Sequence, residues 1–77
     1  MRDITKERPI GLAYTHPLHM KWNGEEITMP GEVFSVVEVV NHGGEKIYVT
    51  NKWYKPGVPQ ILHERLVLRY AEIPPAK

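Results

Sequence analysis

The residue types best suited to chemistry in this chain are its four histidines. His16 and His19 are separated by two residues, a spacing at which two imidazoles on a turn can share a metal ion. The remaining ligands would have to come from His42, His63 and Glu64, which are distant in the sequence. Because a stable site needs several ligands at defined spacing, and a second close pair is missing, we expect surface histidines and no metal site.

A second group with chemical potential is the run His63-Glu64-Arg65, which contains a base, an acid and a cation. Consecutive side chains diverge by ~100° on a helix and point to opposite faces of a strand, so they seldom converge on one substrate. The sequence has no cysteine and no serine-centred nucleophile motif, and Gly43-Gly44 reads as a hairpin turn rather than a phosphate loop. We therefore predict no catalytic residues, no enzyme activity and no cofactor.

The segment that best suits binding has two adjacent aromatic residues, Trp53 and Tyr54, between Lys52 and Lys55. Neighbours in a strand face opposite ways, so one ring must point away from the core unless the strand bulges. An exposed ring beside cations suits a protein hot spot or a stacked nucleic-acid base, and the alternative is a half-buried ring at the end of the core. The candidate binding residues are Trp53, Tyr54, Lys52, Lys55, Lys46, Arg69 and Trp22.

Trp22 precedes the clearest structural signal in the chain, the pair Asn23-Gly24. Asn-Gly favours a two-residue type I′ turn, because both central residues need positive φ. This turn predicts a hairpin from Leu18 to Met29 with Met20 opposite Ile27. The register places Leu18, Met20, Trp22, Ile27 and Met29 on one face and His19, Lys21, Glu26 and Thr28 on the other.

The rest of the chain has the short apolar runs and turn signals of further strands. We expect strands over Pro9 to Thr15, Val33 to Val40, Lys46 to Tyr54 and Leu66 to Ile73, the last with Leu66, Leu68 and Tyr70 inward. The stretch from Pro59 to Arg65 suits either a single 3-10 turn or a continuing strand. Residues 1–8 are expected to be a flexible arm, 9–73 a single domain and 74–77 a flexible tail.

Length and composition set the class of protein. Seventy-seven residues form one small domain with little room for a deep cleft. The net charge is +1, although residues 41–77 carry six Lys or Arg against three Asp or Glu. We find neither a membrane-spanning run nor a secretory signal, so we expect a cytoplasmic protein with no membrane partner.

The order of these elements resembles the SH3-like small β-barrels over roughly residues 9–73. The strand ending at Tyr14 would lead into a long hairpin-like excursion, followed by a hairpin, a 3-10 turn and a closing strand. Gly11-Leu12-Ala13-Tyr14 echoes the Ala-Leu-Tyr-Asp-Tyr segment of peptide-binding SH3 domains. The acidic cluster of that family is reduced to Glu25-Glu26, and no tryptophan pair opens the next strand. The resemblance implies an all-β antiparallel barrel of five to six strands, with an OB-like barrel as the alternative closure.

These features favour a non-catalytic protein-interaction module, in the manner of a small accessory or inhibitory protein, which binds a protein partner through an exposed aromatic and basic surface. The alternative is a nucleic-acid-binding barrel that uses the basic C-terminal half. A dedicated nucleic-acid binder usually has a pI above ~9, whereas this chain has a pI of about 8.1. The oligomeric state does not follow from the sequence.

Overall fold

The structure of the chain is a computed structural model that describes residues 3–75. Its elements are η1 (Ile4–Lys6), β1 (Gly11–Thr15), β2 (Leu18–Trp22), β3 (Glu25–Met29), β4 (Val33–His42), β5 (Glu45–Lys55), β6 (Val58–His63), η2 (Glu64–Leu66) and β7 (Val67–Glu72). Strands dominate and the two η elements are single 3-10 turns. The predicted all-β class is therefore confirmed.

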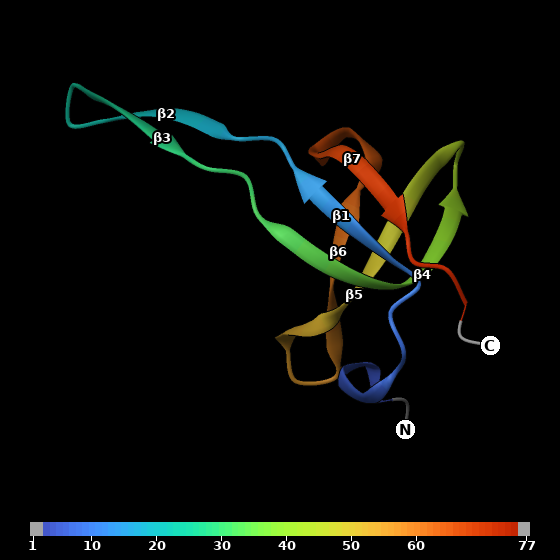
Figure 1. Cartoon of the computed structure of the whole chain (residues 1–77). Helices are drawn as coiled ribbons and strands as arrows, with labels where there is room; N and C mark the ends of the chain where they lie inside the picture. The colour runs from blue at the N-terminus through green and yellow to red at the C-terminus, as the bar shows by residue number, and fades with distance from the viewer. Residues whose placement is uncertain (1–2, 76–77) are drawn as a thin grey trace.

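The strands form two antiparallel sheets of unequal size. Five strands pair in the order β6-β5-β4-β1-β7, and β2 and β3 pair with each other in a separate two-stranded ribbon. In Figure 1 the ribbon projects far beyond the five-stranded sheet, and it accounts for the long dimension of the 50 × 27 × 27 Å molecule.

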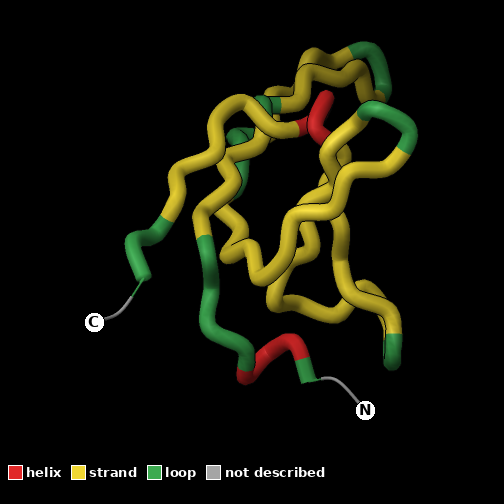
Figure 2. Tube along the Cα trace, turned by 90° about the vertical axis from the view of Figure 1, so that its right-hand side faces the viewer, coloured by secondary structure: helices red, strands yellow, loops and turns green. Residues whose placement is uncertain are grey.

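The closed barrel that we expected is not observed within residues 3–75, because β6 and β7 are the two edges of the sheet. The chain passes from β6 to β7 through η2, where the Val67 amide donates a hydrogen bond to the Glu64 carbonyl. The Leu66 carbonyl accepts a hydrogen bond from the His16 amide. Register shifts in β4–β5 and β5–β6 bend the strands, and Figure 2 shows the sheet curled on itself. The curl brings the inward-facing side chains together, although β6 and β7 are not paired by backbone hydrogen bonds.

Turn chemistry explains the two hairpins of the large sheet. The β4–β5 hairpin turns at Gly43-Gly44, both with positive φ (61° and 83°), as the sequence predicts. The β5–β6 hairpin turns at Pro56-Gly57, where Gly57 has a φ of 81°. Both alternatives for Pro59 to Arg65 are partly realised, since β6 continues to His63 before the 3-10 turn begins.

The core is small and draws on every strand of the large sheet. Ala13, Val36, Tyr48 and Leu62 are buried, and Phe34, Val67 and Tyr70 pack against them. Gly11 leaves space for the Tyr70 ring, because a Cβ at this position would overlap the phenol. The Tyr48 and Tyr70 rings lie 5.0 Å apart, and burial, followed by Glu72 and Tyr48, raises the pKa of Tyr70.

The predicted inward set of the last strand is wrong for Leu66 and Leu68, which are exposed. Tyr14 pairs with Arg69 but Thr15 pairs with Val67, so Leu68 is the extra residue of a β-bulge. The bulge changes the alternation of faces and turns Val67 and Tyr70 toward the core.

The beginning of the chain, which we expected to be a flexible arm, contains a 3-10 turn that lies against the sheet. Asp3 caps η1 by accepting a bond from the Thr5 amide, and Ile4 is 2% exposed where η1 packs on β5. Burial of an isoleucine side chain contributes about 1.5–3 kcal/mol to the packing of this turn on β5. Residues 1, 2, 76 and 77 of the expected arm and tail lie outside the described residues. Across residues 3–75, no helix reaches the length and apolar character needed to cross a membrane.

Candidate functional site

The ribbon has the predicted register at all five pairs. They are Leu18–Met29, His19–Thr28, Met20–Ile27, Lys21–Glu26 and Trp22–Glu25. Asn23 and Gly24 have φ values of 51° and 80°, the positive pair that a type I′ turn requires. The local turn therefore decides which side chains share a face.

The apolar face of the ribbon, defined by Leu18, Met20, Trp22, Ile27 and Met29, lies open to solvent. Each of these side chains is exposed, by 38% at Ile27 to 63% at Trp22. On the polar side, His19 Nδ1 lies 3.0 Å from Thr28 Oγ1. Large apolar side chains gathered on one exposed surface are typical of an interaction site.

The base of the ribbon is held in place by Thr15 and Glu32. The Thr15 amide donates to the Glu32 carbonyl at 2.9 Å, and the Glu32 amide donates to Thr15 Oγ1 at 2.8 Å. Gly31 lies so close to the Thr15 carbonyl that a Cβ would overlap it. These contacts set the direction in which the ribbon leaves the sheet.

A groove of about 620 Å³ lies where the ribbon meets the large sheet. Leu18 and Met29 from the ribbon form one side of it, and Phe34, Leu62 and Leu66 are among the residues of the other side. His16, Glu32 and Arg65 supply its charged or titratable groups. The groove thus extends the apolar face of the ribbon onto the sheet. Sequence reasoning missed it, although the apolar Leu66 beside a turn is a signal that pointed there.

The adjacent aromatics lie at a different place, beside the β5–β6 turn. Trp53 pairs with Pro59, and both rings are exposed, Tyr54 by 70%. Figure 1 shows this turn well apart from the tip of the ribbon, where Trp22 lies. The structure therefore does not join Trp22 to the other predicted aromatics.

The predicted cations have different surroundings. Lys52 Nζ lies 5.4 Å from the centre of the Phe34 ring, and the Arg69 guanidinium lies 4.3 Å from that of Tyr14. Lys46 is the second residue of β5, and Lys55 is the last. Cation–π contacts hold two of these cations against the sheet, and strand length separates the other two.

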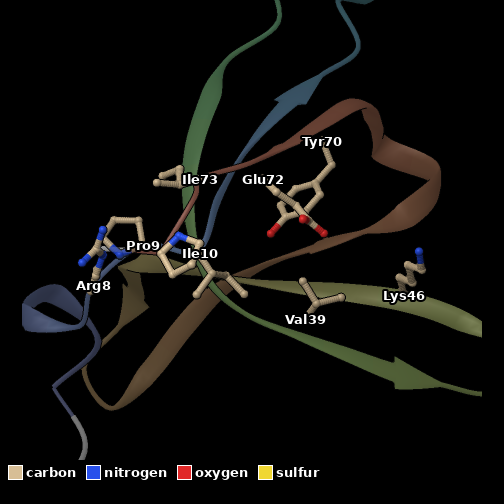
Figure 3. Close-up of a pocket in the computed structure, with 9 residues that line it drawn as sticks. Arg8, Pro9, Ile10, Val39, Lys46, Tyr70, Glu72 and Ile73 are labelled. Carbon is tan, nitrogen blue, oxygen red and sulfur yellow. The ribbon is translucent and has the colours of Figure 1, made fainter. Parts of the chain in front are cut away.

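Lys46 instead lines a second groove, of about 740 Å³, together with Arg8, Ile10, Tyr70 and Glu72. Figure 3 shows Arg8 and Lys46 at opposite ends, with the oxygens of Tyr70 and Glu72 between them. A carboxylate between two separated cations opposes the binding of an anion in the centre of this groove.

The run His63-Glu64-Arg65 connects η2 with the β4–β5 turn. Glu45 accepts from His63 Nδ1 at 3.1 Å and lies 3.4 Å from Arg65 Nε, and Glu64 accepts from the Lys46 amide at 3.2 Å. The pKa of Glu45 is lowered, chiefly by the hydrogen bond with His63. Desolvation is the second-largest effect and opposes this shift, and the charges of Arg65 and His63 lower the pKa further. The arrangement is a structural clamp between two segments of chain.

Within the described part of the chain, His, Asp and Glu side chains nowhere form a group of three or more that could hold a metal ion. His19 and His63 already have side-chain neighbours, Thr28 and Glu45.

Comparison with protein-family models, with curated proteins and with solved structures found no match to this chain.

Proposed function

We propose that this chain is a non-catalytic protein-interaction module, and that its contact surface is the apolar face of the β2–β3 ribbon. The observation that carries the proposal is the exposure of all five apolar side chains of that face. Tryptophan is among the residues that contribute most to protein interfaces, and Trp22 lies at the tip of the ribbon, where a partner meets it first.

We further propose that the large sheet is an open relative of the SH3-like barrels. The strand order β6-β5-β4-β1-β7, with β1 between β4 and β7, supports this assignment. The ribbon occupies the place of the long excursion after the first strand, and a 3-10 turn precedes the last strand. In this view the sheet is a scaffold and the ribbon is its specialised part.

The separation of the cations favours a protein partner over nucleic acid. Nucleic-acid binding depends on Lys and Arg side chains that follow a phosphate backbone, whereas Lys46, Lys52 and Arg69 lie on different parts of the sheet. The ribbon face instead offers apolar side chains, and these suit the buried centre of a protein interface.

Affinity capture from a native lysate, with and without nuclease, tests the proposal. The wild-type chain, Trp22→Ala and the matched control Tyr54→Ala are compared. We expect Trp22→Ala to weaken capture by ~2 kcal/mol or more, while Tyr54→Ala and nuclease leave it unchanged. Loss of capture on nuclease treatment would support nucleic acid, and loss with Tyr54→Ala alone would place the contact surface at the β5–β6 turn.

A further inference from the structure

The ribbon needs a second layer that the described chain does not supply. A two-stranded hairpin is at best marginally stable in water unless a further layer covers its apolar face. Here that face projects from the sheet, with Met20 and Ile27 exposed at its middle. The identity of the molecule that covers this face rests on the proposed function, in which the face is a contact surface.

The dimensions of the chain are those of a subunit rather than of a compact monomer. Its accessible surface is 6075 Å², whereas a folded monomer of 8.9 kDa exposes about 4,800 Å². Its radius of gyration is 14.4 Å, compared with about 11.5 Å for a compact chain of this length. The excess surface exceeds the ~800 Å² that each partner buries in a standard interface.

The chain also carries both halves of a matching contact. Trp22 at the tip of the ribbon is a large apolar projection, and the groove at the base of the ribbon is an apolar depression. Leu18 and Met29 belong to the apolar face and to the groove, so the two surfaces are continuous.

We propose that a second copy of this chain covers the face, bound head to tail about a two-fold axis that lies midway between the two ribbons, perpendicular to their strands and level with the Met20–Ile27 pair of each. Leu18 and Trp22 are each two residues from Met20, so the rotation places Trp22 of one copy over Leu18 of the other. The groove begins at Leu18 and Met29, so the tip of each ribbon enters the groove of the second copy. The two ribbons stack about 10 Å apart, and every contact occurs twice.

Charge distinguishes this arrangement from a head-to-head one. Glu25, opposite Trp22, is the charged residue on the same side of the ribbon as the apolar face. Head-to-tail stacking brings it to the groove of the second copy, where Arg65 is 71% exposed and His16 lies nearby. Head-to-head stacking would crowd the two Glu25 carboxylates at one end and leave both grooves empty.

Sedimentation equilibrium over a range of concentrations tests the dimer. We expect the wild-type chain to form a reversible dimer of twice 8.9 kDa, and Tyr54→Ala to dimerise equally well. Trp22→Ala removes an anchor from each copy and should weaken dimerisation about 1,000-fold, since a loss of about 30-fold occurs twice. A wild-type chain that stays monomeric, or a dimer that Trp22→Ala leaves intact, overturns the proposal.

Thiol cross-linking tests the orientation, because the chain contains no cysteine of its own. The variants Glu25→Cys and Met29→Cys, one of them labelled with ¹⁵N, are mixed and treated with a short bis-maleimide, since ribbons stacked about 10 Å apart are too far apart for a direct disulfide. Head-to-tail stacking places position 25 of one copy over position 29 of the other, so mixed cross-links should exceed the half expected from random pairing. Cross-links formed mainly within each variant overturn this orientation.

Two results distinguish a failure of the proposed dimer from a failure of the proposed function. A monomeric wild-type chain whose Trp22→Ala variant loses its captured protein overturns the dimer and leaves protein binding by the ribbon in place. A monomeric wild-type chain whose Trp22→Ala variant captures the same proteins overturns both.

Discussion

At the scale of single residues, the polar and charged side chains of this protein mainly connect segments of its own chain. Glu45 joins the β4–β5 turn to η2 through His63 and Arg65, and Arg69 lies over the ring of Tyr14. Solvent screens contacts of this exposed kind, so each of them contributes little to the stability of the fold.

The clamp at Glu45 predicts a pH dependence with a definite sign. Since the pKa of Glu45 is lowered from 4.5, its ionised form stabilises the fold above pH 4.5, and this contribution is lost as the pH falls through the lowered value. We expect His63→Ala to raise the pKa of Glu45 toward 4.5, and Arg65→Ala to raise it by less, because the hydrogen bond with His63 is the largest cause.

A ¹³C NMR titration of the Glu45 carboxyl group measures both effects. Lys21→Ala, on the distant ribbon, serves as the control and should leave the titration unchanged. If the pKa responds more to Arg65→Ala than to His63→Ala, charge rather than hydrogen bonding dominates the clamp.

At the scale of elements, the ribbon combines a strongly specified register with a tightly packed base. Its tip requires residues that tolerate positive φ, because Asn23 and Gly24 adopt this backbone conformation. Its base requires a residue without a side chain at Gly31, because a Cβ there would overlap the Thr15 carbonyl. The two ends are thus sensitive to different changes in sequence.

Gly31→Ala should loosen the ribbon from the sheet. The added methyl group displaces the backbone where Thr15 and Glu32 pair, at a cost of ~1–3 kcal/mol. Amide hydrogen exchange should then accelerate in β2 and β3 more than in β4 and β5. Gly44→Ala, which strains the β4–β5 turn where a Cβ meets open space, is the control and should show the reverse pattern. Equal acceleration in both regions would mean that ribbon and sheet unfold together.

At the scale of the whole molecule, the five-stranded sheet carries the core, and the ribbon carries a set of exposed apolar side chains that share one face. The buried cluster of Ala13, Val36, Tyr48 and Leu62 includes no ribbon residue. The proposed contact surface thus lies outside the part of the chain that forms the core.

Replacing residues 17–30 by Asn-Gly should remove self-association and keep the fold. Thr15 and Glu32 are already paired, so a short turn between His16 and Gly31 can close the hairpin. We expect a cooperative melt within a few degrees of the wild-type Tm and a monomeric mass by light scattering. A shortened chain that does not fold would show that the ribbon contributes to the stability of the sheet.

The sequence by itself determined the features that depend on neighbouring residues. Asn23-Gly24 and Gly43-Gly44 set two hairpin turns, and the alternation from Leu18 to Met29 set the register and faces of the ribbon. Positive φ at a turn and the two-residue period of a strand are local properties, so they can be predicted without knowledge of the fold.

The tertiary structure alone decided where the sheet stops and what its surfaces contain. A bulge at Leu68 put Val67 rather than Leu68 toward the core and left Tyr70 inward as expected, and the contact of η1 with β5 buried Ile4. The meeting of the ribbon with the large sheet created the groove beside Leu66. These outcomes depend on pairings between residues far apart in the sequence, where one extra residue in a strand redirects every side chain that follows it.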